Sequence, residues 1–204
     1  MGRRKTYERE EVLQRAMRLF WERGFHATTT RDLTDAMGVN IYSLYAEFGS
    51  KEGLFDAVLD HYDRTVVDGY FSQLEAATSG LETVREVVRF FAEAADQGNP
   101  LLGCLTANAM TEQAPNGNAS RQRGTAYTAR LTTAFKNALE NAKAAGDLRL
   151  DAPVLELAHF VSVSLMGMFV MLRAGGELAV MQHTASHIIA RVESYSTGKS
   201  RIPG

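Results

Sequence analysis

The sequence predicts an all-α fold, and three observations support this prediction. Nearly every segment with a clear hydrophobic period repeats at three and four residues, whereas none alternates convincingly as a strand would. Apolar residues make up 45% of the 204 residues, which is enough to build a core. Clusters of turn-forming residues separate the periodic segments. We expect helices over approximately 8–23, 30–37, from 40 onward, 51–74, 81–95, 103–113, 120–145, 153–174 and 177–195.

The most informative stretch runs from His26 to Phe55, where a short helix, a tight turn and a second short helix are expected. The hydroxyls of Thr28–Thr30 can cap the first of these helices. Gly38 supplies the permissive backbone that a tight turn needs, and Asn40 is a good cap for the second helix. Three apolar residues of the first helix share one face and are expected to pack inward: Leu33, Ala36 and Met37. This pattern is typical of a helix-turn-helix, which is a DNA-binding motif.

The second short helix has an unusual outward face. Leu44 and Phe48 lie four residues apart and are expected to face inward. The residues left to face outward are Ile41, Tyr42, Ser43, Ala46 and Glu47. An outward isoleucine and tyrosine on one short helix are costly to leave in water, so we expect this face to contact a partner.

From Gly38–Val39 through Leu54–Phe55 the chain follows the pattern GV-x(4)-LY-x(2)-F-x-SKE-x-LF. This pattern resembles the signature of the TetR/AcrR family of transcriptional regulators, and the resemblance is close over residues 8–60. It implies an N-terminal three-helix DNA-binding domain, followed by C-terminal helices that bind a small molecule and dimerise. The expected parts are a helix-turn-helix DNA-binding domain at 1–50, a helical effector-binding and dimerisation domain at 51–195, and a flexible tail at 196–204.

A helix-turn-helix places the N-terminal part of its second helix in the major groove, while the preceding helix crosses the phosphate backbone. The resemblance implies contacts to base edges from four residues: Asn40, Ile41, Tyr42 and Ser43. It implies phosphate contacts from Thr30, Tyr45 and Lys51, and it places Arg31 where some members contact a base or a phosphate. The basic residues Arg3, Arg4 and Lys5 can form an arm along the DNA.

Simpler interpretations exist for some of these residues. Tyr45 can be a half-buried packing residue, Lys51 can be a solvated charge that balances Glu52, and the basic N-terminus can be a solubilising tail. The chain also departs from the family at Ala46–Glu47, where an aromatic and a histidine-like residue are frequent. Glu47 would repel phosphate or accept a hydrogen bond from a cytosine amino group.

The charge distribution gives weak support to DNA binding. The whole chain carries a net charge of −2, so it does not coat nucleic acid by bulk charge. Residues 1–55 hold nine basic and eight acidic residues, whereas the remainder holds 13 and 16. The asymmetry has the sign expected for an N-terminal DNA-binding domain.

Cysteine content and hydropathy indicate a cytoplasmic protein. The single cysteine, Cys104, rules out an internal disulfide framework and fits a reducing compartment. The charged N-terminus has no apolar segment behind it, so no secretory signal is expected. The apolar run Val154–Leu172 contains Glu156 and His159, which favours a buried helix over a membrane span. Because this run is apolar nearly all round, we expect it to be covered on more than one side, as in a homodimer interface.

The segment Gly103–Asn108 contains a GCL sequence that resembles a segment of many TetR-family regulators. Candidate ligand-binding residues are Cys104, Asn108, Tyr127 and His159. Apolar residues that can line the same pocket, or simply form core, are Phe90, Phe91, Met110, Phe135, Met166 and Phe169. Cys104 can be a thiol sensor, but a buried core thiol is favoured because no basic residue lies close in sequence.

The expected function is that of a ligand-responsive transcriptional regulator. It would be a repressor that binds a pseudo-palindromic double-stranded DNA operator as a homodimer and is released by a small-molecule effector. The alternatives are a transcriptional activator, a redox-sensing regulator acting through Cys104, a DNA-bending protein, and an enzyme that uses Cys104 as nucleophile and His159 as base. No enzyme motif is found, so no catalytic residue, metal or cofactor is expected. His183 and His187 lie four apart but lack a third metal ligand.

Overall fold

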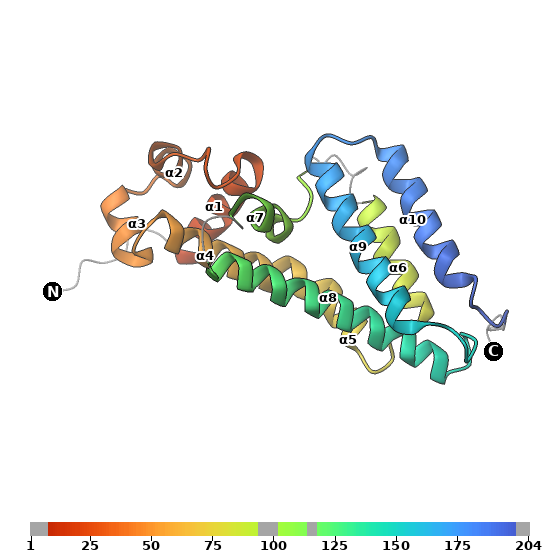
Figure 1. The fold of residues 1–204 in the computed structure, drawn as a ribbon. Coiled ribbons are helices and arrows are strands. Elements are labelled where there is room, and N and C mark those ends of the chain that lie inside the picture. The colour runs from red at the N-terminus through yellow and green to blue at the C-terminus, as the bar shows by residue number, and fades with distance from the viewer. Residues whose placement is uncertain (1–7, 94–101, 114–117, 199–204) are drawn as a thin grey trace. The chain divides into compact units, whose positions relative to one another are not determined.

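The computed structural model describes residues 8–93, 102–113 and 118–198. Within these ranges every regular element is a helix, apart from one isolated β-bridge between Leu148 and Ser196, which confirms the all-α fold. The elements are α1 (Arg9–Arg23), α2 (Thr30–Met37), α3 (Ile41–Phe48), α4 (Lys51–Tyr62), η1 (Asp63–Val67), α5 (Asp68–Glu75), α6 (Leu81–Glu93), α7 (Leu105–Gln113), α8 (Asn118–Ala144), α9 (Val154–Arg173) and α10 (Leu178–Glu193) (Figure 1).

The chain divides into two compact units. The first comprises Met1–Asp68 and Cys104–Arg121, and the second comprises Gly69–Gly103 and Gln122–Gly204. The first unit therefore contains α1 to α4, η1 and also α7, which comes from the middle of the sequence. This grouping differs from the boundary expected at residue 50, because α4 packs against α1 and α3, and α7 packs against α4.

An aromatic cluster forms the core of the first unit. The rings of Phe20 on α1 and Phe55 on α4 have centroids 4.9 Å apart, and Phe25, in the loop after α1, lies 5.0 Å from Phe55. All three side chains are buried. Such aromatic contacts contribute both buried area and preferred geometry. The cluster therefore joins α1, α4 and the loop that leads into α2.

The helix expected over 51–74 is interrupted by a π-helical segment, η1. The backbone N–H of Asp68 donates to the carbonyl of Asp63, five residues earlier. Thr65 also donates its hydroxyl to the carbonyl of His61 at 2.8 Å. The β-branched run Thr65–Val67 is a poor helix former, which fits a local departure from the α-helical hydrogen-bond pattern.

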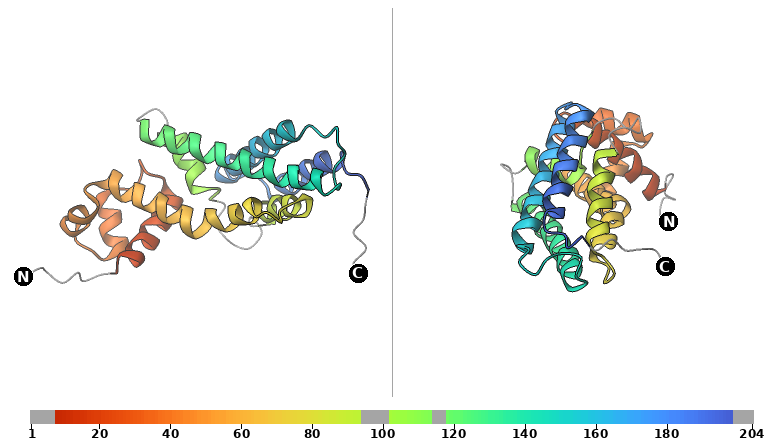
Figure 2. Two further views of the ribbon diagram at one scale, coloured as in Figure 1. Left: turned by 90° about the horizontal axis from the view of Figure 1, so that it is seen from below. Right: turned by 90° about the vertical axis from the view of Figure 1, so that its right-hand side faces the viewer.

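In the second unit α6, α9 and α10 lie side by side (Figure 1), and α8 runs along α5 (Figure 2). Arg130 on α8 donates to Glu75 on α5 at 2.7 Å. The interior combines aromatic contacts with a buried hydrogen bond of 2.8 Å between the hydroxyls of Tyr70 and Tyr127. The ring of Phe91 packs edge-on against that of Phe169, with centroids 4.9 Å apart.

The first residues of the segment expected to be a flexible tail are hydrogen-bonded. The backbone N–H of Thr197 donates to the carbonyl of Asp147 at 3.0 Å, and its hydroxyl donates to the carbonyl of Gly146 at 2.7 Å. These bonds attach residues 196–198 to the turn after α8. Residues 199–204 lie outside the described part of the chain.

Helix α2 is capped by a reciprocal pair of hydrogen bonds. The hydroxyl of Thr29 accepts from the backbone N–H of Asp32 at 3.1 Å, and the Asp32 carboxylate accepts from the backbone N–H of Thr29 at 2.9 Å. Arg23 also donates to Asp32, at 2.6 Å. The Thr29 hydroxyl, the Thr29 backbone N–H and then Arg23 lower the pKa of Asp32. The hydroxyl of Thr28 instead donates to the carbonyl of Gly24 at 2.6 Å.

The variant Asp32→Ala tests this cap. We expect a lower thermal unfolding midpoint than that of the parent at neutral pH, because two backbone N–H groups lose or weaken their partners. The pKa of Asp32 is lower in the folded protein, so its contribution is present above the ordinary pKa and disappears as the pH falls through the folded value. The difference should therefore shrink below about pH 4. A pH series of thermal melts measures this, with Asp35→Ala on the same helix as the control. A difference that does not depend on pH would contradict the assignment.

Candidate functional site

The N-terminal end of α3 presents polar and aromatic groups to solvent. The side-chain oxygen of Asn40 accepts from the backbone N–H of Tyr42 at 2.8 Å, which starts the helix as expected. Leu44 is completely buried and fixes the rotation of α3 against the core. Tyr42 is 82% exposed and Ser43 is also exposed, while Ile41 is half-buried. A large aromatic side chain this exposed is available for contact with a partner.

The cap limits what Asn40 can do. Its side-chain oxygen is engaged by the Tyr42 backbone, so the amide nitrogen is the part that can donate to a base. Acceptors of this kind are the N7 and O6 atoms of guanine and the N7 atom of adenine in the major groove. Asn40 is therefore both a structural cap and a candidate donor.

The start of α2 supplies two further exposed residues, Thr30 and Arg31. The nearest carboxylate partner recorded for Arg31 is Asp35, with Nε and Oδ2 3.6 Å apart and both side chains largely exposed. Exposed pairs of this type contribute little to stability. Arg31 can therefore exchange this partner for a phosphate or a base.

Tyr45 is half-buried on α3, and its hydroxyl stays protonated. Burial raises the pKa of Tyr45, and the negative charge of Glu52 raises it further. A protonated hydroxyl can donate to a phosphate oxygen, which carries no proton to give. Partial burial and hydrogen-bonding capacity are thus compatible in this residue.

Lys51 lies in the first turn of α4, with its ammonium nitrogen 4.5 Å from the centre of the Phe25 ring. Ser50 caps the helix by accepting from the backbone N–H of Gly53 at 3.2 Å. A helix N-terminus favours anions through its free N–H groups and its dipole. The ammonium group lies over the ring of Phe25, so the positive charge is held near the start of α4.

The expectation that Glu47 faces outward is wrong. Its side chain is only 12% exposed, and Oε1 lies 3.3 Å from Nε of Arg9 on α1. The guanidinium of Arg9 also lies 5.4 Å from the centre of the Phe48 ring. The ion pair offsets the charge that would have repelled phosphate. No sequence signal identified Arg9, because it lies 38 positions before its partner.

The basic residues Arg3, Arg4 and Lys5, expected to form an N-terminal arm, lie outside the described part of the chain.

The four predicted ligand-binding residues fall in both units. Cys104 and Asn108 belong to the first, and Tyr127 and His159 belong to the second. Cys104 is buried, which fits a core thiol better than an exposed sensor, and Asn108 is half-buried. Tyr127 is buried against Tyr70, whereas His159 is exposed on α9. Their role in ligand binding stays a prediction.

The sequence did not indicate Ser162, a buried residue of α9. Its hydroxyl has no hydrogen-bond partner among the residues that the structure describes. A serine within an apolar helix carries no sequence signal for this property, because the property depends on the neighbouring helices.

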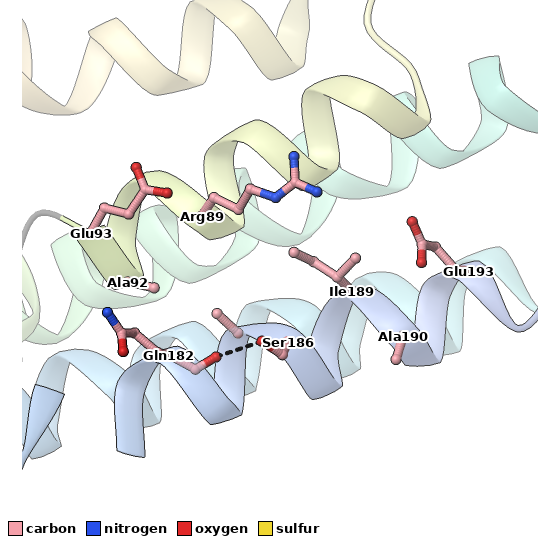
Figure 3. A pocket seen from close by; sticks show the side chains of 9 residues that line it. Arg89, Ala92, Glu93, Gln182, Ser186, Ile189, Ala190 and Glu193 are labelled. Atoms are coloured by element: carbon pink, nitrogen blue, oxygen red, sulfur yellow. Dashed lines mark hydrogen bonds between the residues drawn. The ribbon is translucent and has the colours of Figure 1, made fainter. Parts of the chain in front are cut away.

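A surface pocket of about 360 Å³ lies between α6 and α10 (Figure 3). Arg89 and Glu93 come from α6, and Gln182 and Glu193 come from α10. The small residues Ala92, Ala185, Ser186 and Ala190, together with Ile189, complete the lining. None of the four predicted ligand-binding residues belongs to this lining.

Comparison with known proteins agrees with this geometry. Residues 12–58 match the family model described as "Bacterial regulatory proteins, tetR family", and residues 80–188 match "Tetracyclin repressor-like, C-terminal domain". The chain is 30% identical to the HTH-type transcriptional repressor ComR of Escherichia coli K12, over 90% of this chain and 88% of ComR.

Solved structures show the same fold. A cysteine mutant of the TetR family transcriptional regulator CifR, complexed with 26bp double-strand operator DNA, is 31% identical with a TM-score of 0.82. The match covers 92% of this chain and 98% of CifR. The reduced form of E. coli NemR has a TM-score of 0.77 at 17% identity, over 94% of this chain and 98% of NemR, which shows the shared fold alone.

The two family models together cover most of the chain. The first covers the helix-turn-helix, and the second covers the C-terminal helices. The family comprises DNA-binding regulators and not enzymes. This chain belongs to the TetR family of DNA-binding transcriptional regulators.

Proposed function

We propose that the protein is a cytoplasmic repressor that binds a pseudo-palindromic operator as a homodimer and is released by a small molecule. The observation that carries the proposal is the exposed N-terminal end of α3, where Tyr42 is 82% exposed on a firmly packed helix. Repression is supported by the similarity to ComR, which is named a repressor. Operator binding is supported by the similarity to CifR, which is complexed with operator DNA.

We expect two kinds of contact with the DNA, one to base edges and one to phosphates. Tyr42 and Ser43 can hydrogen-bond to base edges, and Ile41 can pack on a thymine methyl group. Tyr45 and Lys51 donate to phosphates, which positions α3 but carries no sequence information. The choice of operator therefore rests on the first group, and much of the affinity rests on the second.

Tyr45→Phe and Lys51→Ala test the phosphate contacts. Each should weaken binding about tenfold on operator and non-operator duplexes alike, because each removes a hydrogen bond to a charged group. Lys51→Ala should also flatten the slope of log affinity against log salt by about 1, since one fewer counterion is released. Tyr45→Phe should leave that slope unchanged because tyrosine is neutral.

A salt titration of binding to a duplex selected from a random pool makes this measurement. Lys136→Ala on α8 removes an equal charge from the second unit and serves as the control. Equal slopes for Lys51→Ala and the parent would remove Lys51 from the interface.

The exposed apolar face of α9 supports the homodimer. Helix α9 is long and apolar enough to cross a membrane, yet 44% of its apolar 18-residue stretch is buried within the structure. Its exposed apolar residues include Phe160, Val163, Val170 and Met171. Gly167 lies among them, and a Cβ at this position would meet nothing within 4 Å. A glycine inside a helix costs about 1 kcal/mol relative to alanine but allows close approach by another helix. We infer that α9 of a second copy covers this face.

Val163→Arg should convert the dimer to a monomer, because a charge at the centre of an apolar interface is left unpaired. Val163 is 71% exposed, so the fold itself should tolerate the change. Light scattering after gel filtration measures the mass. Leu150→Arg replaces another exposed apolar residue, one outside α9, and should remain dimeric. A dimeric Val163→Arg variant would place the interface elsewhere.

Small-molecule release is supported by polar groups inside the second unit. The hydroxyl of Ser162, which has no hydrogen-bond partner among the described residues, and the linked hydroxyls of Tyr70 and Tyr127 are buried in this unit. Unsatisfied buried hydroxyls cost free energy, and a ligand that hydrogen-bonds to them recovers it. A mainly apolar effector with a hydrogen-bonding group would suit this interior. It would release DNA if it favoured a form of the dimer that does not fit the operator.

Ser162→Ala separates stability from effector response. The variant should unfold at the same or a higher temperature than the parent, because it loses only an unsatisfied hydroxyl. Compounds that raise the unfolding temperature of the parent and release the selected duplex should lose much of both effects. Ser164→Ala, on the same helix and half-buried, is the control. Undiminished release from Ser162→Ala would remove Ser162 from the effector site.

A further inference from the structure

Glu112 on α7 binds the loop between α1 and α2. The two side-chain oxygens of Glu112 accept from two consecutive backbone N–H groups, Oε2 from Phe25 at 2.9 Å and Oε1 from His26 at 2.6 Å. These partners lie 87 and 86 positions apart in sequence. All of them belong to the first compact unit. Hydrogen bonds to an ionised acceptor are among the stronger ones in proteins.

The loop is shaped to receive this carboxylate. Gly24 has φ of +84°, and a Cβ there would lie 2.9 Å from Oε2 of Glu112. A side chain at this position would therefore be strained and would also displace the carboxylate. Thr28 donates its hydroxyl to the carbonyl of Gly24 at 2.6 Å, which closes the loop on itself.

The loop in turn positions groups that face the DNA. The ring of Phe25 packs against Phe55 and lies 4.5 Å from the ammonium of Lys51. Beyond Thr28 the chain enters the cap of α2 at Thr29. Resting on the operator binding proposed above, we propose that Glu112 is a positioning residue for that binding. It fixes the backbone at Phe25, and thereby sets both the placement of Lys51 and the start of α2.

A second hydrogen bond places α7 firmly on the same unit. Near the start of α7, the hydroxyl of Thr106 donates to the carboxylate of Asp63 on η1 at 3.0 Å. Together with the hydrogen bonds of Glu112 near the other end, this hydrogen bond attaches both ends of α7 to the rest of the first unit. Glu112 is thus held in a defined register relative to the loop.

Glu112→Gln is the informative variant, because it keeps the size of the side chain. The amide has one acceptor oxygen, so one of the two N–H groups would face an NH₂ donor. We expect affinity for a duplex selected by the parent protein to fall about tenfold, because the loop loses a charge-assisted hydrogen bond. Affinity for a scrambled duplex should fall as well, because Lys51 is placed to contact phosphates, which carry no sequence information. A thermal melt of the same sample distinguishes positioning from a general loss of stability, because binding should be weaker at a temperature where the variant is still fully folded.

Glu22→Gln removes an equal charge from α1, where Glu22 pairs with Arg18 on the same helix. It should not lower the affinity for either duplex. Affinities of Glu112→Gln equal to those of Glu22→Gln would overturn the proposal. Hydrogen exchange in the parent protein gives a test that needs no variant: the amides of Phe25 and His26 should be protected. Exchange as fast as in an unstructured peptide would also overturn it.

Discussion

The packing of Phe25 between α1 and α4 holds the DNA-binding helices α1 to α4 together. Its ring contacts Phe20 and Phe55 in the core, and the ammonium of Lys51 lies over it. The residues that follow it start α2 with a reciprocal cap. Because α3 then packs through the fully buried Leu44, its outward residues are held at a defined rotation. A DNA-binding domain of this kind needs such rigidity, since base contacts depend on a few side chains at fixed positions.

The features of these DNA-binding helices that the sequence predicted are those specified by neighbouring residues. Gly38 adopts the left-handed conformation that ends α2, Asn40 caps α3, and Leu44 faces the core. Each of these follows from a pattern a few residues long. The contact between Arg9 and Glu47 was not predictable in this way, because its partners are distant in sequence and meet only when α1 and α3 pack. The placement of α7 with the DNA-binding helices was missed for the same reason.

The second unit shows what hydrophobic pattern alone leaves open. The near-uniform apolar character of α9 predicted cover on more than one side, and one side is provided by its own unit. The exposed stripe that includes Val163 remains for a partner. The sequence offered aromatic residues either as pocket lining or as core, and two of them, Tyr127 and Phe169, are buried in the structure. The Ser162 hydroxyl has no hydrogen-bond partner within the described ranges, and this property depends on three-dimensional neighbours that no local sequence pattern indicates.

In the proposed complex, two copies of α3 bind one operator as a symmetric pair. Hydroxyl-radical footprinting of the parent protein on a selected duplex tests this arrangement. A symmetric pair should leave two protected regions related by a two-fold axis, with centres separated by about 10 base pairs or a multiple of that distance. A single protected region, or uniform protection along the duplex, would contradict it.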